Sequence, residues 1–253
     1  MPVTLGEVYN RINEIAPFEL QEEWDNAGIL IGSEKQAVDT VLCALDLTPA
    51  VLDEAIERGA QLVVTHHPIL FRGRKNLRED DPEGRLLCGM VRHGVGLIAA
   101  HTNFDNALPG VNDALAGKLG LTDVQALENG MRVGVPAEGT LGEFRAKAEK
   151  ALGGPVRCYG GEERKISKVA VLGGAGEDFA MQALAAGADV YLTGEMAYHK
   201  GLDAYAAGLC CLEAGHAATE LPAIKMLAEG LQNGADGVKW NLKVLMSEAE
   251  LFR

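Results

Sequence analysis

This chain of 253 residues lacks a C-x-x-C motif, long apolar runs and a recognisable N-terminal signal sequence. Its five cysteines are odd in number and form no C-x-x-C motif, which predicts reduced thiols in a reducing compartment. No apolar run approaches the roughly 18 residues of a membrane span. No charged-then-apolar signal is visible at the N-terminus. The sequence therefore predicts a cytoplasmic protein that does not enter a membrane.

Basic charge is also scarce, because 23 lysines and arginines face 36 aspartates and glutamates. The net charge of -13 and the pI near 4.9 argue against general binding to nucleic acid or to an anionic membrane. A small phosphorylated substrate stays compatible with this charge, because bound metal ions reverse the local sign. The chain is long enough for one large domain or two small ones.

Two adjacent histidines, His66 and His67, follow three apolar or β-branched residues at 63–65. This pattern predicts a buried strand that ends in a loop. Pro68 favours an extended backbone at His67, and neighbouring side chains of an extended backbone point to opposite sides. The two imidazoles are therefore better suited to two different ions than to chelating one. A polar turn at a strand end is the alternative interpretation.

Further donors follow other predicted strands. His101 and Asp105 are four residues apart, and His216 and Glu220 repeat that spacing. Histidine and carboxylate together suit Zn, Mn, Fe, Co or Ni without discriminating among them. No cysteine joins the set, which weakens a structural zinc interpretation. Five or six donors are too many for one ion with an open position, and they fit two.

Two divalent ions about 3.5–4 Å apart can clamp a substrate oxygen and turn a bridging water into hydroxide. We therefore expect a metal-dependent hydrolase that acts on a nucleotide, a phosphoester or a heterocyclic C–N bond, with Asp105 or Glu220 bridging the ions. His101 and Glu195 are the candidate catalytic residues, and His199 is a weaker one; each could instead orient a ligand. A non-catalytic metal carrier or a ring-shaped scaffold that binds a partner is the alternative.

Three other features receive conventional interpretations. The basic segment 72–78 lies close to His66 and His67; we interpret it as a solvated loop, with contact to a substrate phosphate as the alternative. The glycine-rich segment 173–176 follows a predicted strand but lacks the lysine of a Walker loop and the spacing of a dinucleotide fingerprint, so it is interpreted as a turn. Trp24 is expected at the edge of the core, with a place at the border of a functional site as the alternative.

The order of predicted elements indicates an α/β fold. A strand–helix–strand pattern at 41–65 favours a parallel sheet, and ligands bind at the carboxyl ends of the strands of such sheets. The same pattern returns at 169–193 at a constant offset. We therefore expect two related α/β domains from an internal duplication, with the metal site in the cleft between them. The expected units are 1–125, completed by 221–253, and 126–220.

These motifs together resemble the NIF-three-like dinuclear metal-centre proteins, also called GTP cyclohydrolase I type 2 homologs. The matching motifs are Trp24-Asp25-Asn26-x-Gly28, Thr65-His66-His67-Pro68, His101-Thr102-Asn103-x-Asp105, Gly110-Val111-Asn112-Asp113, Thr193-Gly194-Glu195 and Gly215-His216-x-x-Thr219-Glu220. The resemblance runs nearly end to end, with a local departure at Ala217, which follows His216 where the family has Gly-His-His.

The resemblance implies a particular ligand set and assembly. The implied metal ligands are His66, His67, Asp105, His216 and Glu220. Glu220 would bridge two divalent ions in each chain, and His101 would lie beside them. The resemblance also implies two related α/β domains and a toroidal hexamer.

Overall fold

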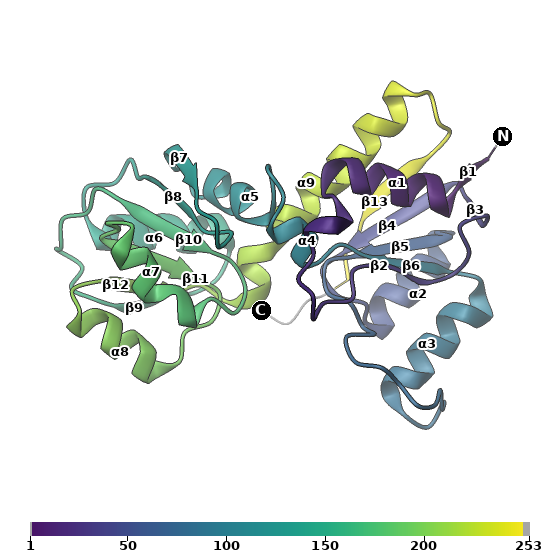
Figure 1. The fold of residues 1–253 in the computed structure, drawn as a ribbon, viewed down its shortest axis with the longest axis horizontal. Coiled ribbons are helices and arrows are strands. Elements are labelled where there is room, and N and C mark those ends of the chain that lie inside the picture. Colours follow the sequence, from purple (N-terminus) through teal and green to yellow (C-terminus); the bar gives the residue numbers. More distant parts are fainter. Residues whose placement is uncertain (1, 250–253) are drawn as a thin grey trace. The chain divides into compact units, whose positions relative to one another are not determined.

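The computed structural model describes residues 2–249, which divide into two compact α/β units (Figure 1). The first unit contains residues 2–108 and 224–249, and the second contains residues 109–223. Among the helices of residues 2–249, none is long and apolar enough to cross a membrane. The two units are described separately below.

The first unit is built on a five-stranded sheet in the order β13-β4-β5-β6-β2. The first four of these strands are parallel to their neighbours, and β2 is antiparallel to β6. Figure 1 shows α1 and the end of α9 on one face of this sheet, and α2 and α3 on the other. The bounds are Thr40–Ala44 for β4, Leu62–Thr65 for β5, Gly96–Ala99 for β6, Gly28–Ile31 for β2, Lys243–Met246 for β13, Leu5–Ile15 for α1, Pro49–Glu57 for α2, Pro82–His93 for α3 and His216–Gly237 for α9.

Local sequence signals explain where these helices begin. Thr4 and Glu7 form a capping box at the start of α1, in which each side chain accepts a hydrogen bond from the other's backbone N–H. Thr48 caps α2 by accepting a hydrogen bond from the Val51 N–H, and Pro49 occupies the first helical turn. The two faces of the sheet are buried, as in parallel sheets covered by helices on both sides. This burial explains the continuous apolar stretches read from the sequence. Two short strands, β1 (Val3–Thr4) and β3 (Ala37–Val38), pair beside this sheet.

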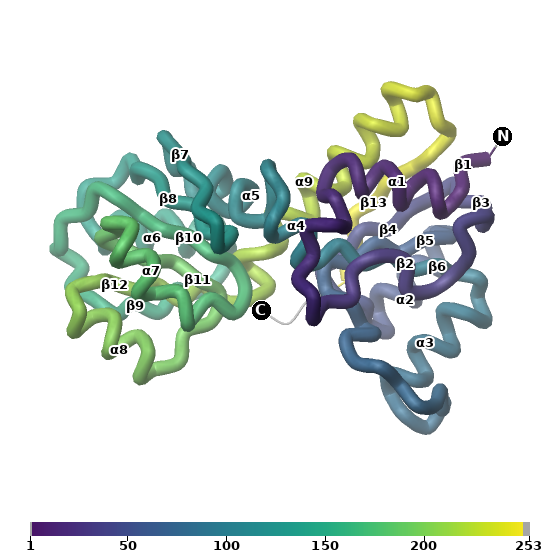
Figure 2. Tube along the Cα trace, viewed as in Figure 1, coloured from purple at the N-terminus to yellow at the C-terminus, as the bar shows by residue number. Residues whose placement is uncertain are grey.

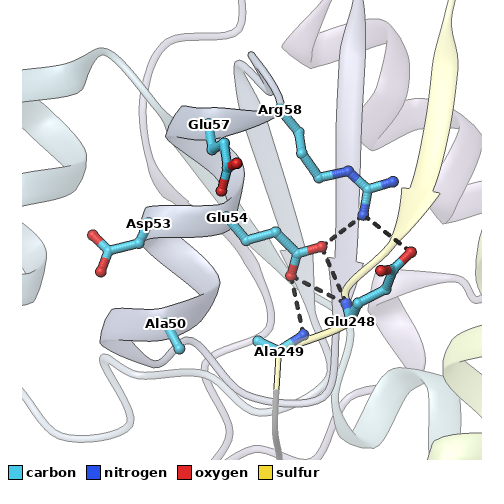
Figure 3. A pocket seen from close by; sticks show the side chains of 7 residues that line it. All are labelled: Ala50, Asp53, Glu54, Glu57, Arg58, Glu248 and Ala249. Atoms are coloured by element: carbon cyan, nitrogen blue, oxygen red, sulfur yellow. Dashed lines mark hydrogen bonds and ion pairs between the residues drawn. The ribbon is translucent and has the colours of Figure 1, made fainter.

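The end of the described chain is fastened to α2 by one carboxylate. Glu54 accepts hydrogen bonds from the Ser247 hydroxyl at 2.6 Å and from the backbone N–H groups of Glu248 and Ala249. Arg58 pairs with Glu54 at 2.6 Å and with Glu248 at 3.8 Å (Figure 3). Burial opposes the charged form of Glu54, but these hydrogen bonds outweigh it and lower its pKa. The carboxylate therefore holds the segment after β13 against α2. Figure 2 traces the chain from α9 into β13 at the yellow end of the colour scale.

The second unit is built on a six-stranded sheet in the order β7-β8-β10-β11-β12-β9. Only β10, β11 and β12 are mutually parallel. α5 and α6 pack on one face, and α7 and α8 on the other, so that successive strand residues enter two separate apolar clusters. The bounds are Thr122–Ala126 for β7, Arg132–Val135 for β8, Arg157–Tyr159 for β9, Val169–Leu172 for β10, Val190–Thr193 for β11, Cys210–Glu213 for β12, Val111–Lys118 for α5, Leu141–Leu152 for α6, Ala180–Ala185 for α7 and Tyr198–Ala206 for α8.

The two sheets share a topological core. In each sheet, two adjacent parallel strands are connected by a helix. Ala44 pairs with Thr65 in the first unit, and Leu172 pairs with Thr193 in the second. The α/β fold class is therefore confirmed. The shared topology is compatible with the predicted internal duplication, which stays a prediction.

The division between the units falls at 108/109, whereas the sequence analysis placed it at 125/126. The difference arises from α5, whose Leu115 and Leu119 join the apolar cluster of the second sheet. The C-terminal helix α9 begins at His216 and contains Pro222.

A buried ion pair fastens α5 to β8. Arg132 is buried, and its guanidinium donates to both carboxylate oxygens of Asp113, at 2.8 and 2.6 Å. Burial opposes the charged form of Asp113, but the hydrogen bonds from Arg132 and the Gly110 N–H outweigh it and lower the pKa. Removing one partner of such a pair leaves a buried charge without compensation.

We expect Asp113→Ala to lower the free energy of unfolding by about 3 kcal/mol at pH 7. Because the pKa of Asp113 is lower in the folded than in the unfolded chain, its stabilisation is present above the ordinary value of 3.8 and is lost as the pH falls through the folded-state pKa. Urea unfolding at pH 7 and pH 3 checks both statements, with the exposed Asp53→Ala as control. Equal losses in the two variants, or a gap that persists undiminished at pH 3, would contradict them.

Candidate metal centre

His66 and His67 leave β5 where its carboxyl end meets the loop. The strand ends at Thr65, and the chain bends at both histidines, whose backbone N–H groups donate to the Leu45 carbonyl at 3.2 and 3.0 Å. The Thr65 hydroxyl donates to the His67 carbonyl at 2.9 Å and stabilises the bend. Because the backbone is not extended here, the expectation of opposed imidazoles is wrong. The two ring centroids lie 5.0 Å apart.

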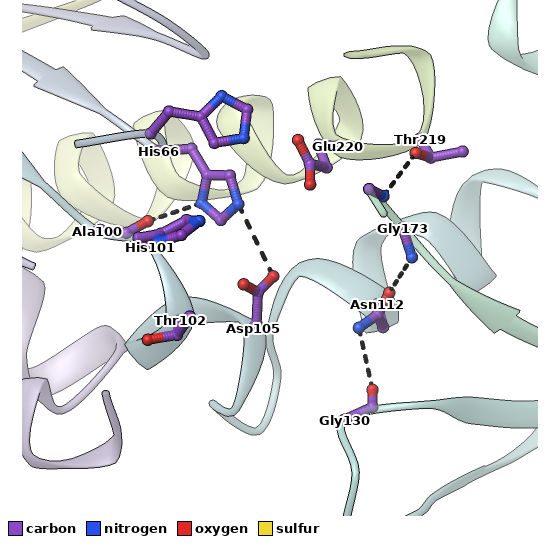
Figure 4. Close-up of polar contacts among 12 residues, drawn as sticks. His66, Ala100, His101, Thr102, Asp105, Asn112, Gly130, Gly173, Thr219 and Glu220 are labelled. Atoms are coloured by element: carbon purple, nitrogen blue, oxygen red, sulfur yellow. Dashed lines mark hydrogen bonds and ion pairs between the residues drawn. The ribbon is translucent and has the colours of Figure 1, made fainter. Parts of the chain in front are cut away.

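His101 joins these two histidines in the first unit. Ligand atoms of His66, His67 and His101 all lie within 4.8 Å of one another, close enough to share metal ions. Asp105 ends the short helix α4 (Thr102–Asp105), one turn after His101. Its carboxylate lies 3.8 Å from His66 Nε2 (Figure 4). The predicted donors of this unit therefore lie together.

Each imidazole is oriented through its Nδ1 atom. The His66 Nδ1–H donates to the Ala100 carbonyl at 2.7 Å, and the His67 Nδ1–H donates to Asp46 at 2.8 Å. Carbonyl and carboxylate oxygens only accept hydrogen bonds, so the proton sits on Nδ1 and the lone pair of the neutral ring is on Nε2. This tautomer, held by a second oxygen, is the one found in histidine metal ligands.

Asp25 orients His101 in the same way. One carboxylate oxygen accepts from His101 Nδ1–H at 2.8 Å, and the other accepts from the Thr102 backbone at 3.1 Å and from its hydroxyl. The Asp25 carboxylate is inaccessible to solvent. Burial opposes its charge, but the hydrogen bonds outweigh this effect and hold the pKa well below its ordinary value. Asp25 is therefore a fixed negative charge behind His101.

The second unit carries the other predicted donors on the first turn of α9. His216 Nε2 lies 3.2 Å from a carboxylate oxygen of Glu220, and Glu220 is only 5% exposed. Glu195, just after β11, accepts from His216 Nδ1–H at 2.8 Å. Glu195 therefore lies where it orients His216. Orienting a ligand is one of the two roles expected for Glu195, and the other is catalytic. His199 is exposed on α8, and His93 is exposed at the end of α3.

The glycine-rich segment 173–176 packs against these donors rather than forming a phosphate cradle. The Gly173 N–H donates to Asn112 at 2.8 Å (Figure 4), and the Gly174 N–H donates to Thr219 Oγ1 at 3.1 Å. The Gly176 N–H donates to Thr193 Oγ1, also at 3.1 Å. Because these N–H groups bond side chains of the protein, the interpretation as a turn agrees with the structure.

Gly174 is required by its surroundings. Its φ is +65°, and a Cβ there would overlap Glu220 Oε1 and lie 3.3 Å from His216 Nε2. We expect Gly174→Ala to weaken metal binding roughly tenfold or more, the size of effect seen when a metal ligand loses its support. Titration with a competing chelator measures this loss.

Gly153→Ala is the matched control for that substitution. Gly153 has a similar φ of +76°, and a Cβ there would meet nothing within 4 Å. The control should share the modest backbone strain, about 1 kcal/mol, without a change in metal affinity. Equal metal affinities of the two variants would show that Gly174 does not protect the carboxylate.

The chemistry of the donors fits divalent cations. In the first unit the lone pair of His66 faces Asp105, and in the second the lone pair of His216 faces Glu220. Two acceptors repel each other unless a cation or a proton lies between them. Imidazole nitrogen with carboxylate oxygen suits Mn, Fe, Co, Ni or Zn. Each unit therefore presents histidine–carboxylate groups that could bind a metal.

The fold and these groups define a class of protein: a chain of two α/β units with histidine and carboxylate donors for divalent metal at strand ends and on a helix. Comparison with known proteins identifies the family. The chain belongs to the Duf34/NIF3 (NGG1p interacting factor 3) family, whose model matches residues 3–251. The resemblance inferred from the sequence motifs is confirmed.

Curated relatives and solved structures agree with this assignment. The chain is 30% identical to the GTP cyclohydrolase 1 type 2 homolog of Clostridium acetobutylicum, covering 98% of this chain and 97% of the relative. It is 35% identical to the homolog of the same name from Streptomyces coelicolor, with coverages of 96% and 91%. A Bacillus cereus protein related to NIF3 matches with a TM-score of 0.95 at 25% identity, over 100% and 99% of the two chains. Reduced HcgD from Methanocaldococcus jannaschii matches with a TM-score of 0.84 at 28% identity, over 97% and 98%.

Proposed function

We propose that this protein binds two divalent metal ions and hydrolyses a nucleotide, a phosphoester or a heterocyclic C–N bond. The observation that carries the proposal is the set of four histidines whose Nδ1–H groups are all held by oxygen acceptors. These hydrogen bonds hold each ring in the tautomer that carries its lone pair on Nε2, which is the form found in histidine metal ligands. The proposed ligands are His66, His67, Asp105, His216 and Glu220, with Glu220 as the bridge.

The first unit supplies two of the proposed histidine ligands and one carboxylate, and the second supplies one histidine and one carboxylate. Two ions that each keep an open position need about three protein ligands apiece, and a bridging carboxylate counts for both ions. When bound, the ions would polarise the substrate and acidify water.

The chain's own residues would move the proton. His101 is held by Asp25 in the tautomer that leaves Nε2 basic, so His101 is suited to accept a proton from water and return it to the leaving group. Glu195 is 57% exposed, and we propose that it chiefly orients His216, with proton exchange to solvent as its second role. The relatives' name makes GTP one natural test substrate.

A substrate screen tests the hydrolase proposal. Metal-stripped protein is reconstituted separately with Mn, Fe, Co, Ni and Zn, then assayed on GTP, cyclic nucleotides, phosphoesters and amides. We expect turnover that depends on metal and is lost in Glu220→Ala. Absence of turnover with every metal and substrate, together with no effect of the substitution, would overturn the proposal.

A metal carrier is the second candidate function. Exposure favours it, since His67 and His216 are 24% and 34% exposed and their ions could exchange with an acceptor. Transfer of metal to an apo-acceptor, without turnover of any substrate, would support this function over the first.

Two further proposals concern the setting of the protein. From the family resemblance we propose a toroidal hexamer, for which sedimentation should give six times the chain mass of 26.8 kDa. A mass of one or two chains in sedimentation would contradict the hexamer.

All five cysteines are free thiols, which supports a reducing compartment such as the cytoplasm.

A further inference from the structure

An exposed aromatic pair lies beside His101 in the first unit. Trp24 is 60% exposed and Phe71 is 44% exposed. Their ring centroids are 5.8 Å apart, and each lies 6.3 Å from that of His101. The expectation that Trp24 marks the edge of the core is therefore wrong. Large aromatic side chains left open to solvent next to a functional group are typical of binding sites.

Phe71 also lines a pocket of about 570 Å³ in this unit, a volume that suits a small ligand. Asn26, Leu70 and Leu77 contribute to its walls. The Asn26 side-chain amide donates to the Leu70 carbonyl at 2.6 Å and joins the segment after Trp24 to the loop after His67. The aromatic pair is therefore held in place by a hydrogen bond between two segments distant in sequence.

The pocket contains one arginine available to an anion. Arg74 is already neutralised, because its guanidinium pairs with Glu83 at 2.6 Å and with Asp81. Arg72 also lines the pocket and is exposed, and within residues 2–249 its guanidinium forms no ion pair or hydrogen bond. In a chain with a net charge of -13, a cation without a carboxylate partner beside two open aromatic rings suits a ligand that is both flat and anionic.

We propose that this pocket binds a phosphorylated planar heterocycle, with the ring against Trp24 and Phe71 and the phosphate at Arg72. Ring stacking tolerates many heterocycles, and the guanidinium supplies paired donors to phosphate oxygens. The proposal deepens the proposed function and rests on it for the role of the ligand as substrate, since the ring would lie beside His101. Binding itself requires no metal ion.

Fluorescence of Trp24 tests the pocket directly. The chain has two tryptophans, so a Trp240→Phe background leaves Trp24 as the only one. This protein is kept metal-free with a chelator and titrated with AMP and GMP. Adenosine, which lacks the phosphate, and ribose 5-phosphate, which lacks the base, are titrated in parallel. We expect quenching by a nucleotide, with both fragments binding at least about tenfold more weakly.

Substitutions assign that binding to the named residues. Phe71→Ala and Arg72→Gln should each weaken nucleotide binding roughly tenfold or more. Lys75→Gln removes a charge from the same exposed loop outside the pocket lining, and Tyr198→Ala removes an exposed ring in the second unit; both should bind as the parent does.

Three outcomes would overturn the inference. The first is that neither nucleotide binds more tightly than its fragments. The second is that Lys75→Gln weakens binding as much as Arg72→Gln, which would indicate diffuse attraction. The third is that Phe71→Ala changes the oligomeric state but not nucleotide binding, which would assign the pair to an interface between copies. Because the titration uses metal-free protein, failure of the metal proposal would leave its result unchanged.

Discussion

The Glu220→Ala variant is expected to lose about one metal ion per chain and to lower any metal-dependent turnover by roughly a thousandfold or more. Glu220 is a buried carboxylate 3.2 Å from His216 Nε2, and in the proposed site it bridges both ions. Removing it would weaken both ions at once and leave His216 without its facing carboxylate. The fall in turnover should therefore exceed the fall caused by removing a ligand that touches one ion.

Chelator competition, elemental analysis and a substrate assay measure the three parts of this expectation. Glu229→Ala is the matched control, because Glu229 is an exposed glutamate on the same helix. Its Oε1 lies 3.7 Å from Nζ of Lys225, in an exposed ion pair. Circular dichroism verifies that both variants are folded. If Glu220→Ala held two ions as tightly as the parent, Glu220 could not be a bridging ligand.

Asp25→Asn and Asp46→Asn should separate the roles of His101 and His67. Each aspartate accepts the Nδ1–H of one histidine at 2.8 Å. For Asp46→Asn we expect metal affinity to fall by about 10–100-fold, because His67 is a proposed ligand. For Asp25→Asn we expect metal affinity to change little and turnover to fall by about 10²–10⁴-fold, because His101 is the proposed proton carrier.

Metal affinity and turnover are measured on the same preparations, with the exposed Asp53→Asn as control. A large loss of metal affinity in Asp25→Asn would make His101 a ligand. That result would require a ligand set different from the one proposed.

Much of the fold could be predicted because its signals are local. The buried strands β4, β5, β10 and β11 are continuous apolar runs, and the caps at Thr4 and Thr48 depend on residues three positions away. β7 carries no such signal, because all five of its residues are exposed at the sheet edge, where no apolar pattern is needed. The affiliation of α5 depends on tertiary packing, which the sequence of the helix alone does not encode.

The sequence predicts the candidate metal donors more fully than the residues that orient them. Histidines and carboxylates at the ends of predicted strands indicate metal donors by their chemistry and their spacing. Asp46 follows β4 at the same edge as His67, a signal that was available but unused. Asp25 is distant from His101 in sequence, so only the folded chain reveals that it holds the imidazole. The bend at His66 and His67 likewise depends on the Leu45 carbonyl of a neighbouring segment.

Counting metal ions tests the central claim most directly. Untagged protein is purified without chelator, and its metal content per chain is determined by elemental analysis for the wild type and for His67→Ala. We predict about two divalent ions per chain in the wild type and a fall toward one in the variant. A wild type that holds at most one ion after reconstitution, or a variant that holds as many as the wild type, would contradict a two-metal site built on His67.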